Sequence, residues 1–407
     1  MLNFSVGSLV FAIVIILMPI LMRLSWKMRP FIFLVVNTAI FVCTFNKIYA
    51  FVVAAAWILI PYFAAPLLVS TDEKGNKYFR TIFYVAMLTA FLYLMHYDWI
   101  VIFQKIPYYK ALKFLGLSYF LFREIDYTMQ YGYLKETRVK LSFVDYFNYV
   151  TSFYTIMAGP ILRYEEFVTD FYDETKAELS ADDIISQMHR VVFGYIKLYV
   201  ISSFMSFMSG YWFGRITEAG NIFKAVIIYL IFAAFNAGFI YFNFVGYCDV
   251  VTGAARLAGL TLRENFNKPY MARSMVEFWN RHHITLSEWI RDYIYSPIIK
   301  ALLSGAFKKK LFQAQCCALF MTFLIAGIWH GTNFNYVVYG LLEGLGVVLS
   351  SVRTQKLKKK YGKKGLKEYE KRKGVIIFEH CWTLMYVAVS FSFVGYDVVG
   401  LLTGVVK

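Results

Sequence analysis

The chain has 407 residues, of which 59% are hydrophobic and 20% are aromatic, and its formal net charge is +16. Soluble domains are about 45–50% apolar, so this composition excludes an ordinary soluble protein and predicts one that crosses a membrane several times. The basic residues lie between the apolar runs, where they set orientation and meet anionic lipid headgroups. Nucleic acid is therefore not expected as a partner, whereas the lipid bilayer is.

Apolar runs separated by charged or polar residues predict the membrane helices. A run of about 20 apolar residues can cross the hydrocarbon core as a helix. We therefore expect an all-α polytopic membrane protein with about eleven transmembrane helices, forming one membrane-embedded domain over residues 1–407. The apolar runs lie at about 4–22, 30–45, 48–69, 81–95, 143–161, 191–213, 222–245, 311–329, 334–350 and 375–402, with the mixed region 98–133 between the fourth and the fifth.

The region 98–133 is mixed in character. It combines aromatic pieces, a break at Pro107 and three charged residues, Arg123, Glu124 and Asp126. Charges at membrane depth usually pair with one another or face water. A structural ion pair and a functional role are equally consistent with this pattern.

Charges in the loops predict the orientation of the chain. The stretch 353–373 contains eleven basic residues and two glutamates, and a second basic stretch lies at 308–310. Both are expected on the cytoplasmic side. The two apolar runs between these stretches must cross the membrane outward and then back. His330 is therefore expected at the turn between them, far from the cytoplasmic face. The first basic loop, 23–29, is also expected inside, so both termini are predicted to be extracytoplasmic.

The segment between Pro269 and Pro297 has a helical period but too many charges to cross lipid alone. Its apolar positions recur at steps of three, four and seven, which predicts one amphipathic helix. His283 falls on the apolar face of that helix, whereas His282 points about 100° away. We therefore expect this helix at the interface or along a cavity. Its apolar positions are Val276, Trp279, Leu286, Ile290 and Tyr293.

His330 lies among apolar and small residues, and Gly327 and Gly331 beside it permit close backbone approach. Neutral imidazole is favoured in such surroundings because desolvation disfavours the charged form. A neutral histidine can take the proton from an incoming hydroxyl and so activate it as a nucleophile. On the residues alone, a packed core histidine bonded to a carbonyl is an equal alternative.

Nothing in the sequence indicates metal or nucleotide chemistry. The five cysteines have no ligand-like spacing, adjacent histidines on a helix diverge, and no H-x-x-x-H pattern occurs. No glycine-rich phosphate-binding motif is present either. We expect no metal site.

Several stretches resemble motifs of one family. Together they cover about 153–346, and their combination is far more specific than any single stretch. The stretches 264–270 (ENFNKPY), 277–295 (EFWNRHHITLSEWIRDYIY) and 327–331 (GIWHG) are similar to the core motifs of the membrane-bound O-acyltransferase (MBOAT) family, and 158–167 and 241–260 resemble further blocks of its bacterial branch.

This resemblance implies an acyltransferase domain: an MBOAT-like bundle with shorter re-entrant or interfacial helices around a cytoplasmic funnel. It also implies that His330 is the catalytic histidine and that His283 is the second family histidine. The branch contains D-alanyl transfer proteins of the DltB type, which act on teichoic acid from a carrier-protein thioester. It also contains O-acetylation proteins of the AlgI and PatA type.

We therefore expect an enzyme of the plasma (inner) membrane that moves an acyl group from a cytoplasmic thioester donor to a hydroxyl outside. The donor is expected to be a phosphopantetheine carrier protein or acetyl-CoA, with no covalently bound cofactor. The acceptor is expected to be a cell-envelope polymer, an intermediate carrier or a partner transferase. His330 would act as general base or acyl relay, and His283 would orient or help to activate. The expected substrate-binding residues are Asn280, Ser287, Trp279, Arg291, Asn265 and Trp329.

The sequence departs from the family pattern at His282, usually tryptophan, at Cys248, usually serine, and at Asn243, commonly aspartate. A length near 400 residues and an end soon after the last run favour the D-alanyl type, whereas the stretch 291–298 (RDYIYSPI) resembles the acetyl type. D-alanyl is slightly favoured and acetyl comes next. A transporter or scramblase, or a non-catalytic scaffold of an envelope complex, is the alternative, and either would tolerate loss of His330.

Overall fold

The computed structural model describes residues 9–24, 26–45, 47–73, 77–95, 116–176 and 178–404, and all regular structure in them is helical. Two parts of the sequence predictions lie outside these residues: the start of the first expected span and the part of the mixed region up to residue 115. Within the described residues, eight helices are long and apolar enough to cross a membrane. The prediction of an all-α polytopic membrane protein is thereby confirmed, whereas the number of about eleven spans stays a prediction.

The chain divides into two compact units, and the prediction of a single domain stays a prediction. The first unit comprises the described residues up to Tyr195 together with Gly246–Arg263. Its helices are α1 (Leu9–Leu24), α2 (Arg29–Thr44), α3 (Ile48–Glu73), α4 (Lys77–Met95), α6 (Leu117–Glu136), α7 (Phe143–Val150), α8 (Tyr164–Phe171), α9 (Ala181–Tyr195) and the last part of α11 (Ile222–Leu257).

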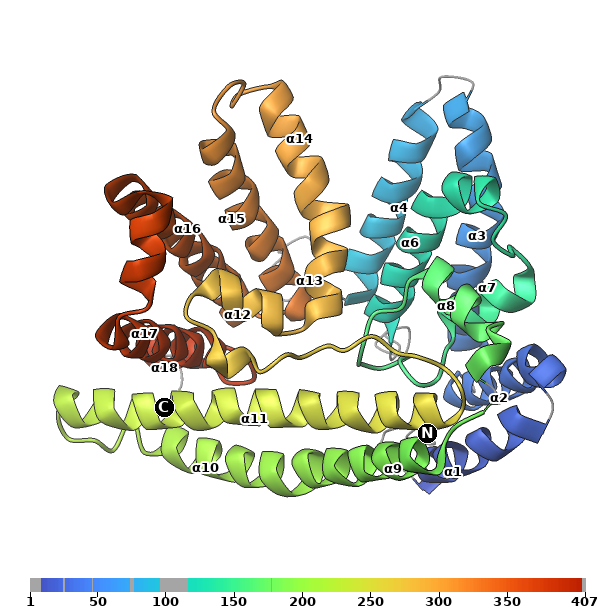
Figure 1. The fold of residues 1–407 in the computed structure, drawn as a ribbon, viewed down its shortest axis with the longest axis horizontal. Coiled ribbons are helices and arrows are strands. Elements are labelled where there is room, and N and C mark those ends of the chain that lie inside the picture. Colours follow the sequence, from blue (N-terminus) through green and yellow to red (C-terminus); the bar gives the residue numbers. More distant parts are fainter. Residues whose placement is uncertain are drawn as a thin grey trace. The chain divides into compact units, whose positions relative to one another are not determined.

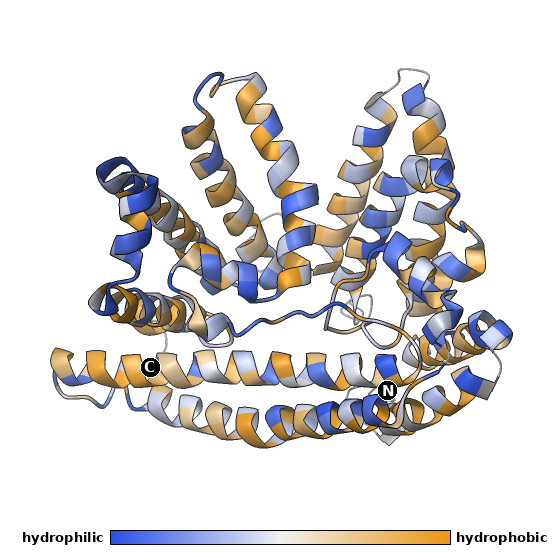
Figure 2. Ribbon diagram, viewed as in Figure 1, coloured by the Kyte–Doolittle hydropathy of each residue, from blue (hydrophilic) through white to orange (hydrophobic). Residues whose placement is uncertain are grey.

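The second unit comprises Ile196–Val245 and the chain from Glu264 onward. Its long helices carry many apolar side chains on their outer surfaces, as a lipid environment requires, and Figure 2 shows hydrophobic residues along much of their length. Besides the first part of α11, its helices are α10 (Ser202–Gly214), α12 (Met275–Arg281), α13 (Ile284–Ile290), α14 (Ser296–Ser304), α15 (Leu311–His330), α16 (Phe334–Glu370), α17 (Lys373–Phe391) and α18 (Val398–Thr403) (Figure 1).

The apolar run at 143–161 is not a span. It forms only the eight-residue helix α7, which Ser142 caps at its start, and then continues as irregular backbone. Irregular backbone is tolerated at membrane depth only where its polar groups find partners inside the protein. The buried guanidinium of Arg123 supplies them, donating to the carbonyl oxygens of Val150 at 2.6 Å and Thr155 at 2.7 Å.

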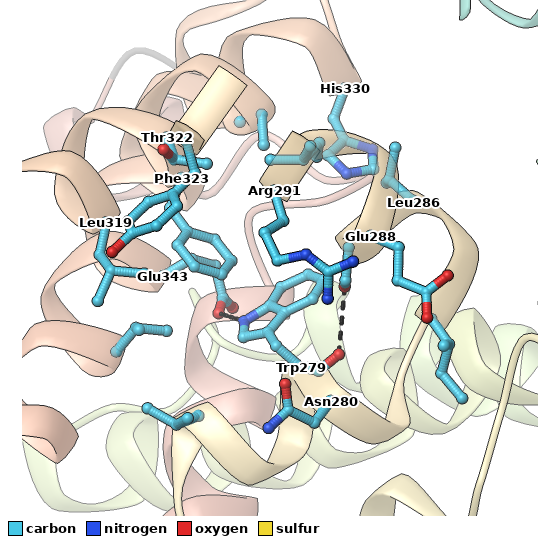
Figure 3. Close-up of a pocket in the computed structure, with 18 of the residues that line it drawn as sticks. Trp279, Asn280, Leu286, Glu288, Arg291, Leu319, Thr322, Phe323, His330 and Glu343 are labelled. Carbon is cyan, nitrogen blue, oxygen red and sulfur yellow. Dashed lines mark hydrogen bonds between the residues drawn. The ribbon is translucent and has the colours of Figure 1, made fainter. Parts of the chain in front are cut away.

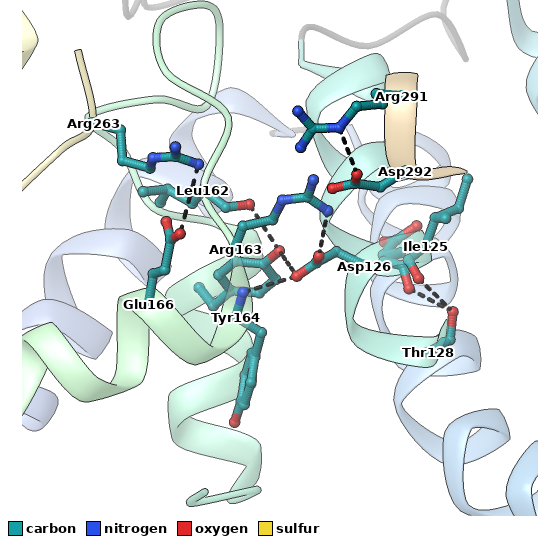
Figure 4. A network of polar contacts seen from close by, with 12 residues as sticks. Ile125, Asp126, Thr128, Leu162, Arg163, Tyr164, Glu166, Arg263, Arg291 and Asp292 are labelled. Atoms are coloured by element: carbon teal, nitrogen blue, oxygen red, sulfur yellow. Dashed lines mark hydrogen bonds and ion pairs between the residues drawn. The ribbon is translucent and has the colours of Figure 1, made fainter. Parts of the chain in front are cut away.

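Asp126 has a structural role in the same unit. Its carboxylate pairs with Arg163 at 2.9 Å and accepts from the backbone N–H of Tyr164 at 2.8 Å (Figure 4). It also accepts from the hydroxyl of Tyr149 at 3.1 Å. These contacts join α6 to the irregular segment and to the start of α8. Both residues thus contact and hold the backbone of this unit, but the ion pair expected of Arg123 with Glu124 or Asp126 does not form: Arg123 donates to carbonyl oxygens, and Asp126 pairs with Arg163.

Helices α15 and α16 form an antiparallel hairpin in the second unit, because Gly327 faces Gly340 and Phe320 lies against Gly344. The start of α15 and the region near Arg353 therefore lie at one end of the hairpin, and His330 lies at the other. This agrees with a pair of helices that goes out and returns. With 20 residues, α15 spans about 30 Å, the thickness of the hydrocarbon core.

The last apolar run, 375–402, is two helices rather than one. Helix α17 ends at Phe391, and α18 begins at Val398. Gly395 lies between them with φ at +86°, a conformation that ends a helix and that glycine adopts without strain. Asp397 then caps α18, its carboxylate accepting from the N–H of Gly400 at 2.9 Å.

Crowding at the glycine crossing leads to a stability prediction. A Cβ atom at Gly327 would stand 2.6 Å from the backbone nitrogen of Gly340 and 2.7 Å from the carbonyl oxygen of Tyr336, so the helices would have to move apart. Gly327→Ala should lower the free energy of unfolding by about 1–3 kcal/mol. Thermal unfolding of the purified protein in detergent measures this loss.

Gly374→Ala is the matched control, because a Cβ atom there meets nothing within 4 Å and alanine favours the first turn of α17. It should leave the unfolding temperature unchanged or raise it slightly. Equal unfolding temperatures for the Gly327 variant and the wild type would show that the hairpin does not depend on this close approach.

Candidate active site

The segment from Pro269 to Pro297 is not the single helix that its apolar period predicts. Helix α12 ends at Arg281, His282 is extended, and His283 adopts φ +48° and ψ +51° before α13 begins. The break is held by the stretch 265–267, which pairs with it. The N–H of Asn267 donates to the carbonyl of Arg281 at 2.8 Å, and the N–H of Ile284 donates to that of Asn265 at 3.0 Å.

Asn265 anchors the start of α13. Its side-chain oxygen accepts from the backbone N–H of Thr285 at 3.1 Å and from the hydroxyl of Thr285 at 2.9 Å, and the residue is buried. Because the first N–H groups of a helix have no partner within it, this side chain satisfies one of them. Asn265, expected to bind substrate, thus contacts Thr285 and does not line the cavity described below.

Pro297 does not end the helical segment either. After α13 the chain forms a π-helix over Arg291–Tyr295 and continues directly into α14, with Pro297 in the first turn of that helix. A proline ring clashes with the carbonyl four residues before it in an α-helix. The wider π turn relieves this clash, and the hydroxyl of Ser296 donates to the carbonyl of Arg291 at 2.8 Å.

A cavity of about 380 Å³ lies in the second unit, among α12, α13, α15 and α16 (Figure 3). Its wall is mostly apolar, and a small number of polar groups point into it, as is typical of ligand sites. Four of the apolar positions that predicted the amphipathic helix, all but Tyr293, line it. The polar and charged lining residues are Asn280, Ser287, Glu288, Arg291, Thr322, His330 and Glu343, together with Trp279, Tyr295 and Tyr339.

His330 is the last residue of α15, where the hairpin turns. Its ring lies 4.5 Å from that of Trp329 and 5.7 Å from that of Tyr339, measured between centroids. It forms no hydrogen bond with any residue that the structure describes, so its nitrogens are open to a molecule in the cavity. The next residue must be glycine, because a Cβ atom at Gly331 would overlap the ring of Tyr336. This is the close approach that the sequence predicted at Gly331.

Four expected substrate-binding residues line the cavity with His330 (Figure 3). Among the described residues, the amide of Asn280 has no hydrogen-bond partner and is open to the cavity. The hydroxyl of Ser287 donates to the carbonyl of Trp279 at 3.2 Å, and the indole N–H of Trp279 donates to Glu343 at 2.9 Å. Arg291 is exposed and pairs with Asp292 at 3.1 Å.

His283, His282 and Trp329 lie behind the cavity wall and do not line it. The ring of His283 packs against Phe244 at 4.6 Å, and that of His282 stacks on Phe278 at 4.9 Å. Burial, together with a smaller effect of His330, lowers the pKa of His282 to about 3. Burial, His282 and His330 lower the pKa of His283 well below its usual value, so both rings are neutral at physiological pH.

Glu343 is a functional candidate that the sequence reasoning missed. It is buried in the first third of α16 and lines the cavity. The signal was available, because Glu343 is the single charged residue in the apolar run 334–350, and an ionisable residue at such depth is a functional candidate by default.

Comparison with known proteins identifies the family of the chain. The sequence matches the membrane-bound O-acyltransferase family over residues 112–359. The chain therefore belongs to this family, and the resemblance drawn from the motifs is confirmed. The matched range includes every residue of the cavity wall.

Individual relatives carry two kinds of acyl-transfer name. The chain is 30% identical over 236 residues to "Probable alginate O-acetylase AlgI" of Pseudomonas aeruginosa, covering 58% of this chain and 42% of that protein. It is 28% identical over 241 residues to "Teichoic acid D-alanyltransferase" of Bacillus subtilis, covering 59% of each. It is 32% identical over 205 residues to "Peptidoglycan O-acetyltransferase" of Helicobacter pylori, covering 50% of this chain and 37% of that protein. The matches thus span between about a third and three fifths of these relatives.

The buried histidines make stability depend on pH. The pKa of His282 is about 3 in the folded protein and about 6.5 when unfolded, so between these values the unfolded chain binds more protons. Stability is therefore fully present above about pH 6.5 and falls as the pH is lowered. Titration of His282 alone should lower the free energy of unfolding by roughly 2 kcal/mol at about pH 5.

The variant His282→Phe keeps a ring in the aromatic surroundings of this position and removes the titration. Its stability, measured by denaturant unfolding at several pH values, should fall less between about pH 7 and 5 than that of the wild type. His189→Gln, at an exposed position on α9, is the control and should reproduce the wild-type pH profile. If the two variants gave the same profile, acid sensitivity would not arise from the burial of His282.

Proposed function

We propose that this protein is an O-acyltransferase that moves an acyl group from a thioester donor to a hydroxyl of an extracytoplasmic acceptor. D-alanyl is the favoured acyl group and acetyl the next. The acceptor is a cell-envelope polymer or an intermediate carrier. The observation that carries the proposal is the imidazole of His330, which has no hydrogen bond to a described residue and faces an apolar cavity, in a chain of the acyltransferase family.

His330 acts as a general base in the proposed reaction. A ring nitrogen takes the proton of the acceptor hydroxyl, and the oxygen attacks the thioester carbonyl to give a tetrahedral intermediate. When the intermediate collapses, the carbon–sulfur bond breaks and the thiol leaves with the proton from the imidazolium. The products are an ester and a free thiol, and the neutral ring is restored. A second route, in which His330 carries the acyl group transiently, uses the same atoms.

The other polar groups of the cavity hold the donor. The amide of Asn280 and the hydroxyl of Ser287 bind the thioester arm by hydrogen bonds, and Trp279 forms the adjacent wall. Arg291, at the more exposed part of the wall, interacts with the polar part of the donor. His283 orients the site from behind the wall, where its buried ring packs against Phe244.

The donor is proposed to be a phosphopantetheine carrier protein or acetyl-CoA at the cytoplasmic face of the plasma membrane. Two basic stretches, 308–310 and 353–373, support a cytoplasmic position of the donor, because the positive-inside rule predicts them on that side of the membrane. Their charge also suits an acidic carrier. The antiparallel hairpin puts His330 at the end opposite to both stretches, where an acceptor from the other side can reach it.

His330→Ala is the first test. It should abolish transfer from a loaded carrier protein to the acceptor hydroxyl, because no other described side chain in the cavity is a neutral imidazole. Transfer is measured with a radiolabelled acyl group on protein reconstituted in vesicles. The variant should remain monodisperse in detergent with an unchanged helical signal. Normal product from this variant would exclude catalysis by His330, whereas absence of product with the wild type would favour a transporter or a scaffold.

Asn280→Ala tests donor binding separately from the chemical step. Because the amide has no partner among the described residues, its removal leaves no buried group unsatisfied in the free protein. Loss of one hydrogen bond should raise the KM for the thioester donor by about two- to tenfold and leave kcat nearly unchanged. Leu319→Ile, an apolar position on the same wall, is the control with little expected change. A lower kcat at constant KM would place Asn280 in the chemical step.

A further inference from the structure

Glu343 is an acidic side chain with partners but without a counter-charge. One carboxylate oxygen accepts from the indole N–H of Trp279 on α12 at 2.9 Å, and the other accepts from the hydroxyl of Ser390 on α17 at 2.6 Å. Both donors are neutral. In the part of the chain that the structure describes, no lysine or arginine forms an ion pair with Glu343.

Burying the Glu343 carboxylate costs free energy unless a positively charged group pairs with it. A carboxylate buried in an apolar helical setting loses its hydration, and two neutral hydrogen bonds replace only part of it. The one basic residue of the cavity wall, Arg291, pairs with Asp292, and its side chain is 61% exposed. A positively charged group on the molecule that fills the cavity would pair with this carboxylate and offset the cost.

Glu343 also has the capacity and the position to bind such a group. A carboxylate has about four acceptor positions, and Trp279 and Ser390 use two of them. Glu343 lines the same cavity as His330, and Tyr339, one helical turn earlier on α16, packs against the ring of His330. Figure 3 shows the Glu343 carboxylate and the His330 ring on the wall of one cavity.

We propose that Glu343 is a specificity-determining residue, which pairs with a positively charged amino group on the acyl chain and so selects aminoacyl over plain acyl donors. An aminoacyl thioester such as D-alanyl carries an ammonium group with three hydrogen-bond donors, whereas an acetyl group carries none. This inference rests on the proposed function, because it assigns the acyl chain of the thioester donor to this cavity.

The test is a binding measurement, which needs no acceptor and no turnover. Pantetheine thioesters of D-alanine and of isobutyric acid have the same shape, because a methyl group replaces the ammonium. Calorimetric titration of the full chain in nanodiscs at about pH 6.5, where the amino group is protonated, gives the two dissociation constants. The wild type should bind the D-alanyl compound at least about tenfold more tightly.

Glu343→Gln removes the charge and keeps both hydrogen bonds, because its amide accepts from Trp279 and donates to Ser390. It should erase the preference by weakening only D-alanyl binding. Ser390→Ala is the matched control, since it removes one hydrogen bond but keeps the charge, and it should retain the preference. Equal weakening of both compounds by Glu343→Gln would overturn the proposal and make Glu343 a positioning residue for Trp279. Absence of any preference in the wild type would overturn it as well.

The two proposals fail in different ways. If His330→Ala abolishes transfer but Glu343→Gln leaves the D-alanyl preference intact, the acyltransferase function stands and the role of Glu343 is rejected. If the wild type binds neither thioester, the assignment of the donor to this cavity is rejected, and with it the role of Glu343.

Discussion

The candidate site depends on a break between two short helices that is held by hydrogen bonds from a distant stretch of the chain. Residues 265–267 pair with the backbone at Arg281–Ile284, and the side chain of Asn265 holds the start of α13. Without these bonds, the segment would be free to form the continuous helix that its sequence favours. Because the break redirects the chain at His283, α12 and α13 both face one cavity, and Asn280 and Ser287 come to lie on the same wall.

Much of this site was predictable from local sequence, but its backbone was not. The apolar period of the segment identified Val276, Trp279, Leu286 and Ile290, and all four line the cavity. The period survives the break because each short helix turns the same face inward. What the period cannot reveal is the left-handed conformation of His283, since its cause lies in partners that are distant in sequence. The same limit applies to Pro297, which follows a π turn instead of ending the helix.

Buried charges show where the residue type predicts a role and where only the fold decides it. Arg123 and Asp126 attracted notice as charges in an apolar region, and both prove to support irregular backbone that would otherwise leave polar groups without partners. Glu343 stands in the opposite situation, because its carboxylate supports no irregular backbone and faces a cavity. In a single sequence, a charge that supports the backbone and a charge that faces a cavity look the same. Only the partners of each charge, which the fold brings from other helices, tell them apart.

The π-helix at Arg291–Tyr295 has a consequence for comparing this chain with its relatives. A π turn is equivalent to one extra residue in an α-helix, and its loss by deletion leaves the helices on both sides intact. A relative that lacks one residue here can therefore keep the same cavity wall up to Arg291 and the same α14 beyond it. An alignment gap of one position in this stretch thus marks a change of helical winding, and it is no sign of a different architecture.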